Sequence, residues 1–154
     1  EEYGFIDHLN DAKIQAPQTN YVKKTRFTIS KKDDKVLFEH PNSSITYPNI
    51  GIAKNAKLDF AIGINKPAWE KSGDGVQFTI KISSEDSGIK TIFSQYIDPK
   101  NNPKDRRWVR KSLDLKDYEN QKITIVFETQ AGPKKDISFD WAGWKNPRII
   151  YNHN

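Results

Sequence analysis

The chain has 154 residues, of which 35% are hydrophobic, 12% aromatic and 29% charged, with a formal net charge of +5 at pH 7 and no cysteine. This length suits one domain, and the lack of cysteine excludes a disulfide framework and any thiolate metal site. The Lys and Arg residues occur in short pairs beside acids and turns rather than in one stripe, so the charge does not indicate nucleic-acid binding.

Apolar and polar residues alternate with a period of two along the chain, and no segment shows a sustained period of 3.6. We expect Tyr3 to Ile14 to be an edge strand, with 15–20 as a loose connection. Pro48 should end a short strand, because proline cannot donate to a ladder. The alternation predicts strands over 26–30, 36–38, 45–47, 58–64, 76–82, 89–97, 108–115, 123–129, 137–141 and 148–151, with 76–82 and 89–97 forming a hairpin.

Turns at intervals of about 8–12 residues with no helix between them favour an all-β fold. We therefore predict an antiparallel two-sheet β-sandwich, a jelly roll, with about ten strands and no substantial helix. It should be a single domain over 1–154, in which 1–25 supply the N-terminal edge strand and connection and 26–151 form the sandwich core.

Four tryptophans are candidates for ligand contact. Trp69 lies in the loop 65–74, where it either plugs the open end of the sandwich or stacks on a sugar ring with its indole N–H free for a hydroxyl. Trp141 and Trp144 are three positions apart, so in an extended chain they point to opposite faces. We expect Trp141 in the core and Trp144 as a ligand platform, whereas Trp108 opens a strand and should pack.

Catalytic and transition-metal sites are not indicated. No pair of carboxylates is distinguished by apolar surroundings on one partner, and no nucleophile elbow or phosphate-binding loop is present, so we expect no enzyme activity. The three histidines are scattered along the chain. Calcium takes loop carboxylates and backbone carbonyls, and 73–75 and 98–105 are the segments that offer them.

An ordered series of landmarks runs through the chain: FEHP at 38–41, SITY at 44–47, AKLDF at 56–60, GDGVQF at 73–78, RW at 107–108, LDL at 113–115, FET at 127–129 and DWAGW at 140–144. Over roughly 26–151 this series resembles galactose-binding-like jelly-roll modules, in particular those related to the NPCBM carbohydrate-binding modules of bacterial surface and secreted proteins. The resemblance implies a non-catalytic accessory domain of a larger exported or membrane-bound protein. It also implies sugar-binding loops at one end of the sandwich, in some members beside a structural calcium.

We therefore expect an extracytoplasmic, carbohydrate-binding-like module whose ligand surface is formed by the loops 65–74, 98–107 and 141–147. Trp69 and Trp144 would stack on the sugar. Hydrogen bonds would come from Asp74, Arg106, Arg107 and Asp140. Because the planar guanidinium grips a carboxylate well, an anionic polysaccharide is favoured over a neutral one.

The expected partners are this glycan and the remainder of a parent protein, with no nucleic acid and with membrane contact only through a segment outside this chain. The alternative is a structural or protein-interaction domain of a surface or membrane protein that has no sugar site. In that case an exposed aromatic patch would be an interface.

Overall fold

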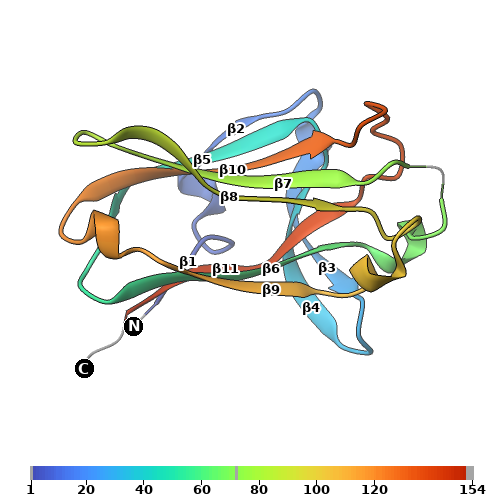
Figure 1. Cartoon of the computed structure of the whole chain (residues 1–154), viewed down its shortest axis with the longest axis horizontal. Coiled ribbons are helices and arrows are strands. Elements are labelled where there is room, and N and C mark those ends of the chain that lie inside the picture. Colours follow the sequence, from blue (N-terminus) through green and yellow to red (C-terminus); the bar gives the residue numbers. More distant parts are fainter. Residues whose placement is uncertain (1, 72, 152–154) are drawn as a thin grey trace.

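The computed structural model describes residues 2–71 and 73–151 as two antiparallel sheets that face each other (Figure 1). Eleven strands are present, and the helical elements are five single turns of 3-10 helix. The predicted all-β sandwich is therefore confirmed. None of the helices in the described residues is long or apolar enough to cross a membrane.

The lower layer in Figure 1, sheet A, has the strand order β3-β4-β11-β6-β9, with β1 also paired to β11. The upper layer, sheet B, has the order β2-β5-β10-β7-β8, and β7 and β8 form the predicted hairpin. Sheet A comprises β1 (Glu2–Gly4), β3 (Val22–Thr28), β4 (Asp33–Glu39), β6 (Ala56–Ile64), β9 (Val109–Asp114) and β11 (Ala142–Tyr151). Sheet B comprises β2 (Lys13–Gln15), β5 (Ser43–Gly51), β7 (Val76–Ser84), β8 (Gly88–Ile97) and β10 (Lys122–Ala131).

The main core lies between the sheets and follows directly from the alternation. In β10, Ile123, Ile125 and Phe127 are buried while the residues between them are partly exposed. Trp144 of β11 is fully buried at the centre, and its ring meets other aromatic rings edge to face. These partners are Phe60, Phe78 and Phe127, with ring centres 5.6, 5.2 and 5.0 Å away.

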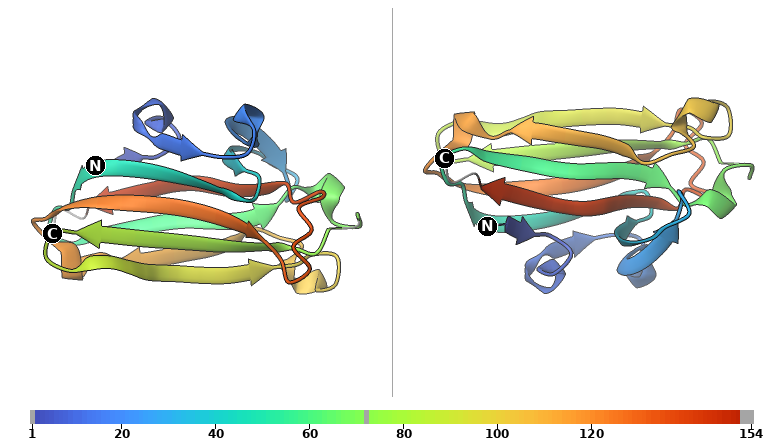
Figure 2. Two further views of the ribbon diagram at one scale, coloured as in Figure 1. Left: turned by 90° about the horizontal axis from the view of Figure 1, so that it is seen from above. Right: turned by 90° about the horizontal axis from the view of Figure 1, so that it is seen from below.

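The N-terminal segment pairs with both sheets. β1 lies on β11 of sheet A, whereas β2 lies on β5 of sheet B, with the single turns η1 (Leu9–Asp11) and η2 (Thr19–Tyr21) on either side of β2. Figure 2 shows this segment along one long side of the sandwich. Phe5 is fully buried and its carbonyl accepts a 2.7 Å hydrogen bond from the Tyr47 hydroxyl, so the segment closes that side of the core. The expected single edge strand is thus two strands on different sheets.

Two predicted boundaries are wrong. Pro48 does not end its strand, because it lies at a bulge where two residues of β5 face one residue of β10. The segment 137–141 is a loop rather than a strand. Phe139 has a φ of 57°, which interrupts an extended chain, and β11 begins only at Ala142.

A second apolar cluster lies on the outer face of sheet A, and we call it the outer cluster. It consists of Phe27, Ile29, Val36, Ala61 and Trp108, all of which are buried. A glycine beneath it is required for close approach. A Cβ at Gly63 would stand 2.8 Å from Cε3 of Trp108 and 3.2 Å from Cδ1 of Ile29. Trp108 therefore packs, as predicted.

The two ends of the sandwich differ. One end, at the right of Figure 1, gathers η3 (Lys66–Ala68), η4 (Pro103–Asp105) and the loop before β11, and we call it the loop end. The opposite end carries η5 (Lys116–Tyr118) and the β7–β8 turn. Glu2 and Ile150 are paired there, so both ends of the described chain lie far from the loop end.

Candidate functional site

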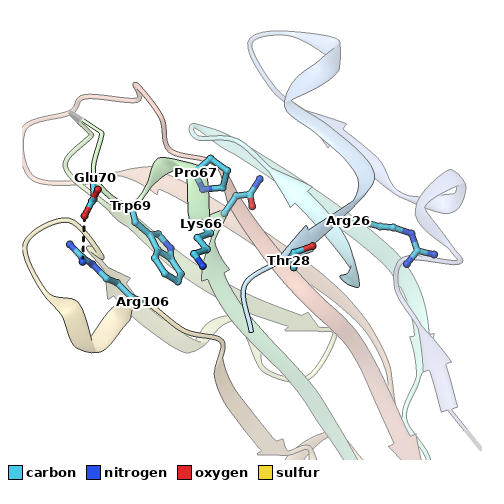
Figure 3. Close-up of a pocket in the computed structure, with 8 residues that line it drawn as sticks. Arg26, Thr28, Lys66, Pro67, Trp69, Glu70 and Arg106 are labelled. Atoms are coloured by element: carbon cyan, nitrogen blue, oxygen red, sulfur yellow. Dashed lines mark ion pairs between the residues drawn. The ribbon is translucent and has the colours of Figure 1, made fainter. Parts of the chain in front are cut away.

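A pocket of about 650 Å³ opens at the loop end, and we call it the end pocket (Figure 3). Three segments that are distant in the sequence form it: β3, the turn after β6, and the residue that follows η4. The lining residues are Arg26, Thr28, Asn65, Lys66, Pro67, Trp69, Glu70 and Arg106.

The turn after β6 places Trp69 in this pocket. Pro67 near the start of η3 favours the tight turn, and the amide of Trp69 donates a 3.1 Å hydrogen bond to the carbonyl of Lys66. The half-buried indole packs against both the main core and the outer cluster. Trp69 therefore closes this end of the core and lines the pocket at the same time, which combines the two interpretations drawn from the sequence.

The indole N–H of Trp69 is not free. Its Nε1 donates a 2.7 Å hydrogen bond to the carbonyl of Ile64, so the expectation that it awaits a sugar hydroxyl is wrong. The ammonium of Lys66 stands 6.0 Å from the ring centre, at the limit of a cation–π contact. What Trp69 offers to a ligand is ring surface held in a fixed orientation.

Arg106 borders the pocket from η4. Its Nε donates a 2.7 Å hydrogen bond to the carbonyl of Pro99, which ties the guanidinium to the loop after β8. An ion pair with Glu70 is 4.0 Å long, with the Glu70 side chain 86% exposed, so solvent screens it (Figure 3). Cations from three segments, Arg26, Lys66 and Arg106, thus line the pocket together with one exposed carboxylate, Glu70.

Arg107 lies outside the end pocket. Its side chain is exposed, and its Nε donates a 3.0 Å hydrogen bond to the carbonyl of Lys104. The structure therefore brings Trp69 and Arg106 together and leaves Arg107 out.

Asp74 and Asp140 are buried rather than presented to a ligand. They are 8% and 1% exposed, and with Asp98, which is 8% exposed, they form what we call the end acid cluster. Asp74 accepts a hydrogen bond from the amide of Lys134, and its carbonyl accepts one from the Tyr96 hydroxyl. Their burial leaves almost no surface for a sugar, so the prediction that Asp74 and Asp140 bind sugar hydroxyls directly is not supported.

Burial and like charge act together in this cluster. Burial, followed by repulsion from Asp74, Asp136 and Asp98, raises the pKa of Asp140 to about 8. Burial, followed by the negative charge of Asp98, raises the pKa of Tyr96 to about 12. A proton or a cation therefore stabilises the cluster at neutral pH.

Calcium, which the fold resemblance implies, fits these residues in part. In the described ranges no three acidic, His or Cys side chains are grouped closely enough to bind a metal by themselves. However, Oδ1 of Asp74 and Oδ2 of Asp140 are buried without a hydrogen-bond partner. A cavity of about 10 Å³ lies beside Asp140, which is room for one water-sized occupant. Asp98 lines it, and so do two cations, Lys71 and Lys100. Calcium accepts such carboxylates together with backbone carbonyls.

Trp144 is not a ligand platform. It is fully buried at the centre of the core, and its Nε1 donates a 2.9 Å hydrogen bond to Oε1 of Glu39. Trp141, which we expected in the core, is only half-buried and contacts Phe139 in the loop before β11. Trp144 lies inside the main core, whereas Trp141 packs against it from the loop, because the strand starts only after Trp141.

Several lining residues were not predicted. Asn65 and Lys66 lie in the same loop as Trp69, so the sequence indicated their place in the site through that loop. Arg26 and Thr28 belong to an edge strand about forty positions earlier. Only the pairing of β3 with β4 brings that strand to the loop end, and no local pattern reveals it.

Comparison with known proteins supports the fold. No family model matches the chain. An uncharacterized protein of Archaeoglobus fulgidus is 43% identical over an alignment of 121 residues, which covers 74% of this chain and 30% of that protein. The chain therefore spans less than a third of the length of this relative.

Three solved structures share the architecture. A CBM51 module from a Clostridium perfringens GH95 protein, in complex with methyl-galactose, has a TM-score of 0.63 at 9% identity, over 97% of this chain and all of that one. The second CBM51 module of Clostridium perfringens ZmpB, in complex with GlcNAc, has a TM-score of 0.61 at 19% identity, over 97% of this chain and 31% of that one. Tandem CBM51 modules of a family 98 glycoside hydrolase from Streptococcus pneumoniae have a TM-score of 0.63 at 16% identity, over 98% and 47%.

The chain has the galactose-binding-like fold. At these identities the likeness concerns the fold alone. In this galactose-binding-like sandwich, the end pocket and the end acid cluster both lie at the loop end. Glu2 and Ile150, which are paired, lie at the opposite end of the sandwich.

Proposed function

We propose that the chain is a non-catalytic carbohydrate-binding module of a larger protein, and that it holds a glycan in the end pocket. One observation carries the proposal. A half-buried tryptophan of fixed orientation lines a basic pocket of about 650 Å³ at the loop end of a galactose-binding-like sandwich.

The pocket chemistry suits a sugar. The ring of Trp69 offers an apolar surface for the C–H face of a pyranose, and Asn65 and Thr28 supply amide and hydroxyl groups that pair with sugar hydroxyls. The cations outnumber the single lining carboxylate, Glu70, so a sugar that carries a carboxylate gains more than a neutral one.

The architecture suits a module displayed on a parent protein. Glu2 and Ile150, near the two ends of the described chain, lie at the end opposite the pocket, so a connection to a parent protein made on that side would leave the pocket free. The relative from Archaeoglobus fulgidus is more than three times the length of the matched region. We assign the module to an extracytoplasmic location, because free polysaccharide is found there.

An interaction domain without a sugar site has less support. The exposed large hydrophobic side chains in the described residues are Ile14, Ile89 and Tyr96. Ile14 lies on one edge of sheet B, whereas the other two lie on β8 at the opposite edge. They form no continuous apolar patch of the kind that marks a protein interface.

The proposal includes a structural calcium at the end acid cluster. The unpaired oxygens of Asp74 and Asp140 and the small adjoining cavity support it. A bound calcium would offset the repulsion between these carboxylates and hold together the loops that form the end pocket.

A glycan array with neutral and acidic oligosaccharides, followed by calorimetry on the best binder, tests the function. We expect Trp69→Ala to abolish or strongly weaken binding. Trp141→Ala is the matched control, because Trp141 is also half-buried in the loop end but does not line the pocket. Equal binding by wild type and Trp69→Ala would refute the assignment of the site.

A further inference from the structure

A second basic hollow lies on the outer face of sheet A, and we call it the sheet groove. It has a volume of about 470 Å³ and is formed by β6, β9 and β11 with the β3–β4 turn. In Figure 2 this face is the one seen from below. Its cations are Lys32, Arg110, Lys111, Lys145 and Arg148, and its one acidic residue is Asp59.

Strand register explains the shape of the groove. Arg110 of β9 and Lys145 of β11 both pair with Ala61 of β6, so a small methyl group forms the floor between two long cationic side chains. Next along the strands, Asp59 has Ser112 on one side and Arg148 on the other. Strands lie about 4.8 Å apart, so the walls are about 10 Å apart.

Several of these cations have no acidic partner. Lys145 is paired with Asp34 at 3.4 Å, and Arg148 with Glu2 at 3.4 Å. In the part of the chain that the structure describes, Lys32, Arg110 and Lys111 form no ion pair. Their charge is available to an anionic partner.

The sheet groove adjoins the end pocket. The same three segments line both: the β3–β4 hairpin, β6 with the turn after it, and the segment from Arg106 into β9. Between the two hollows these segments meet at Ile29 and Trp108 of the outer cluster and at Gly63 beneath them. The side chains of Ile29 and Trp108 are buried there, and the ammonium of Lys145, a cation of the sheet groove, lies 5.9 Å from the ring centre of Trp108.

The positive charge of the protein is concentrated on this path. Eight Lys and Arg residues and two carboxylates line the end pocket and the sheet groove, a formal charge of +6. The whole chain carries +5, so the rest of the molecule has almost no net charge. By contrast, the only ion pair on the outer face of sheet B in the described residues joins Lys81 and Glu128.

We infer that the ligand is an acidic polysaccharide chain that runs from the end pocket across Trp108 into the sheet groove, which forms a second binding site. This inference rests on the proposed function, because the first sugar occupies the end pocket. Carboxylate groups along the chain pair with Lys32 and with Arg110, which shares the outer face of sheet A with its partner Ala61. Asp59 and Ser112, which are 2.6 Å apart at Oδ1 and Oγ, pair with sugar hydroxyls.

The same groups disfavour DNA. The carboxylate of Asp59 accepts hydrogen bonds, and the backbone of DNA offers it no hydroxyl donor, whereas a polysaccharide does. The aromatic side chains at the groove and beside it, Phe60 and Trp108, are buried at 3% and 7% exposure, so bases have no ring to stack on.

Calorimetry with oligogalacturonates of two lengths, a disaccharide and an octasaccharide, tests the inference. The octasaccharide should bind wild type about tenfold more tightly, because it engages both sites. The variant Lys32→Gln, Arg110→Gln should bind both lengths with the affinity that wild type has for the disaccharide. The control Lys13→Gln, Lys122→Gln removes two charges from sheet B and should behave as wild type.

The outcomes separate the two claims. A length advantage that survives in the groove variant would overturn the second site. A single-stranded oligonucleotide of equal charge that binds wild type more tightly than the octasaccharide would overturn the polysaccharide assignment. If instead the end pocket is not the first binding site, Trp69→Ala should bind the disaccharide as tightly as wild type does.

Discussion

The indole Nε1 of Trp69 donates a 2.7 Å hydrogen bond to the carbonyl of Ile64, at the end of strand β6. This bond joins the turn that lines the end pocket to a central strand of sheet A. The ring is therefore held in one orientation before any ligand arrives, which lowers the entropy cost of stacking.

Two replacements of Trp69 distinguish the contribution of ring stacking to glycan affinity from that of the fixed ring orientation. Trp69→Ala removes the ring, and we expect glycan affinity to fall by about 2 kcal/mol, roughly thirtyfold. Trp69→Phe keeps a ring but loses the hydrogen bond to Ile64, so the loss of affinity should be smaller. Calorimetry measures both, with thermal melting to show that the variants fold. Equal losses for Ala and Phe would contradict a stacking role.

Arg106 and Arg107 form a matched pair, because they are adjacent and only Arg106 lines the pocket. For an acidic oligosaccharide we expect Arg106→Gln to weaken binding by about tenfold and to make the remaining affinity less dependent on salt. Arg107→Gln should leave both properties unchanged. Affinity measured at several ionic strengths checks this, and a larger effect from Arg107 would contradict the placement of the site.

Glu39 is buried beside Trp144, and burial raises its pKa well above the usual value despite hydrogen bonds from Trp144 and Ser43. A carboxyl group whose pKa is higher in the folded than in the unfolded protein stabilises the fold at low pH. This contribution to stability is lost as the pH rises through the pKa of the folded state. Glu39→Gln keeps an acceptor for the indole and does not ionise. We expect it to match wild type near pH 4 and to be increasingly more stable than wild type at higher pH, by chemical denaturation.

Glu39→Ala is the contrasting change, since it leaves the buried Nε1 of Trp144 unpaired and opens a void. We expect it to destabilise the fold by about 3 kcal/mol at every pH. If Glu39→Gln is destabilising to the same extent at high pH, the carboxylate is ionised and well solvated in the fold, contrary to its burial.

Asp140 has a pKa of about 8, so without calcium the folded protein holds a proton that the unfolded chain releases near pH 4. Stability should therefore fall between about pH 4 and 8, with a slope of at most about 1.4 kcal/mol per pH unit. Asp140→Asn should remove most of it.

Calcium provides the second arm of this test. Millimolar calcium chloride should raise the melting temperature of wild type at neutral pH, and chelation should lower it again. Asp140→Asn should respond much less. An identical response of wild type and variant would show that calcium, if bound at all, lies elsewhere.

The period-two alternation was sufficient to predict the two sheets, because strands such as β10 and β5 bury alternate residues in the core. It could not predict which residues of β11 point into the core. The positive φ of Phe139 and the bulge between Lys145 and Arg148 shift that strand, so Trp144 rather than Trp141 turns inward.

The site was predictable only where its parts are neighbours in the sequence. Trp69 and Lys66 share one loop, and that loop was identified. The contribution of Arg26 depends on which strands pair, and the burial of Asp74 and Asp140 depends on the packing of three loops. Neither is encoded in the local pattern of residue types.

The indole N–H signals of the four tryptophans test the central claim most directly, because each reports from a known place. In a two-dimensional NMR titration of labelled protein with the glycan selected on the array, the Trp69 signal should shift progressively to saturation. The signal of Trp144, sealed in the core, should stay in place. Saturation of binding with an unchanged Trp69 signal would show that the glycan binds away from the end pocket.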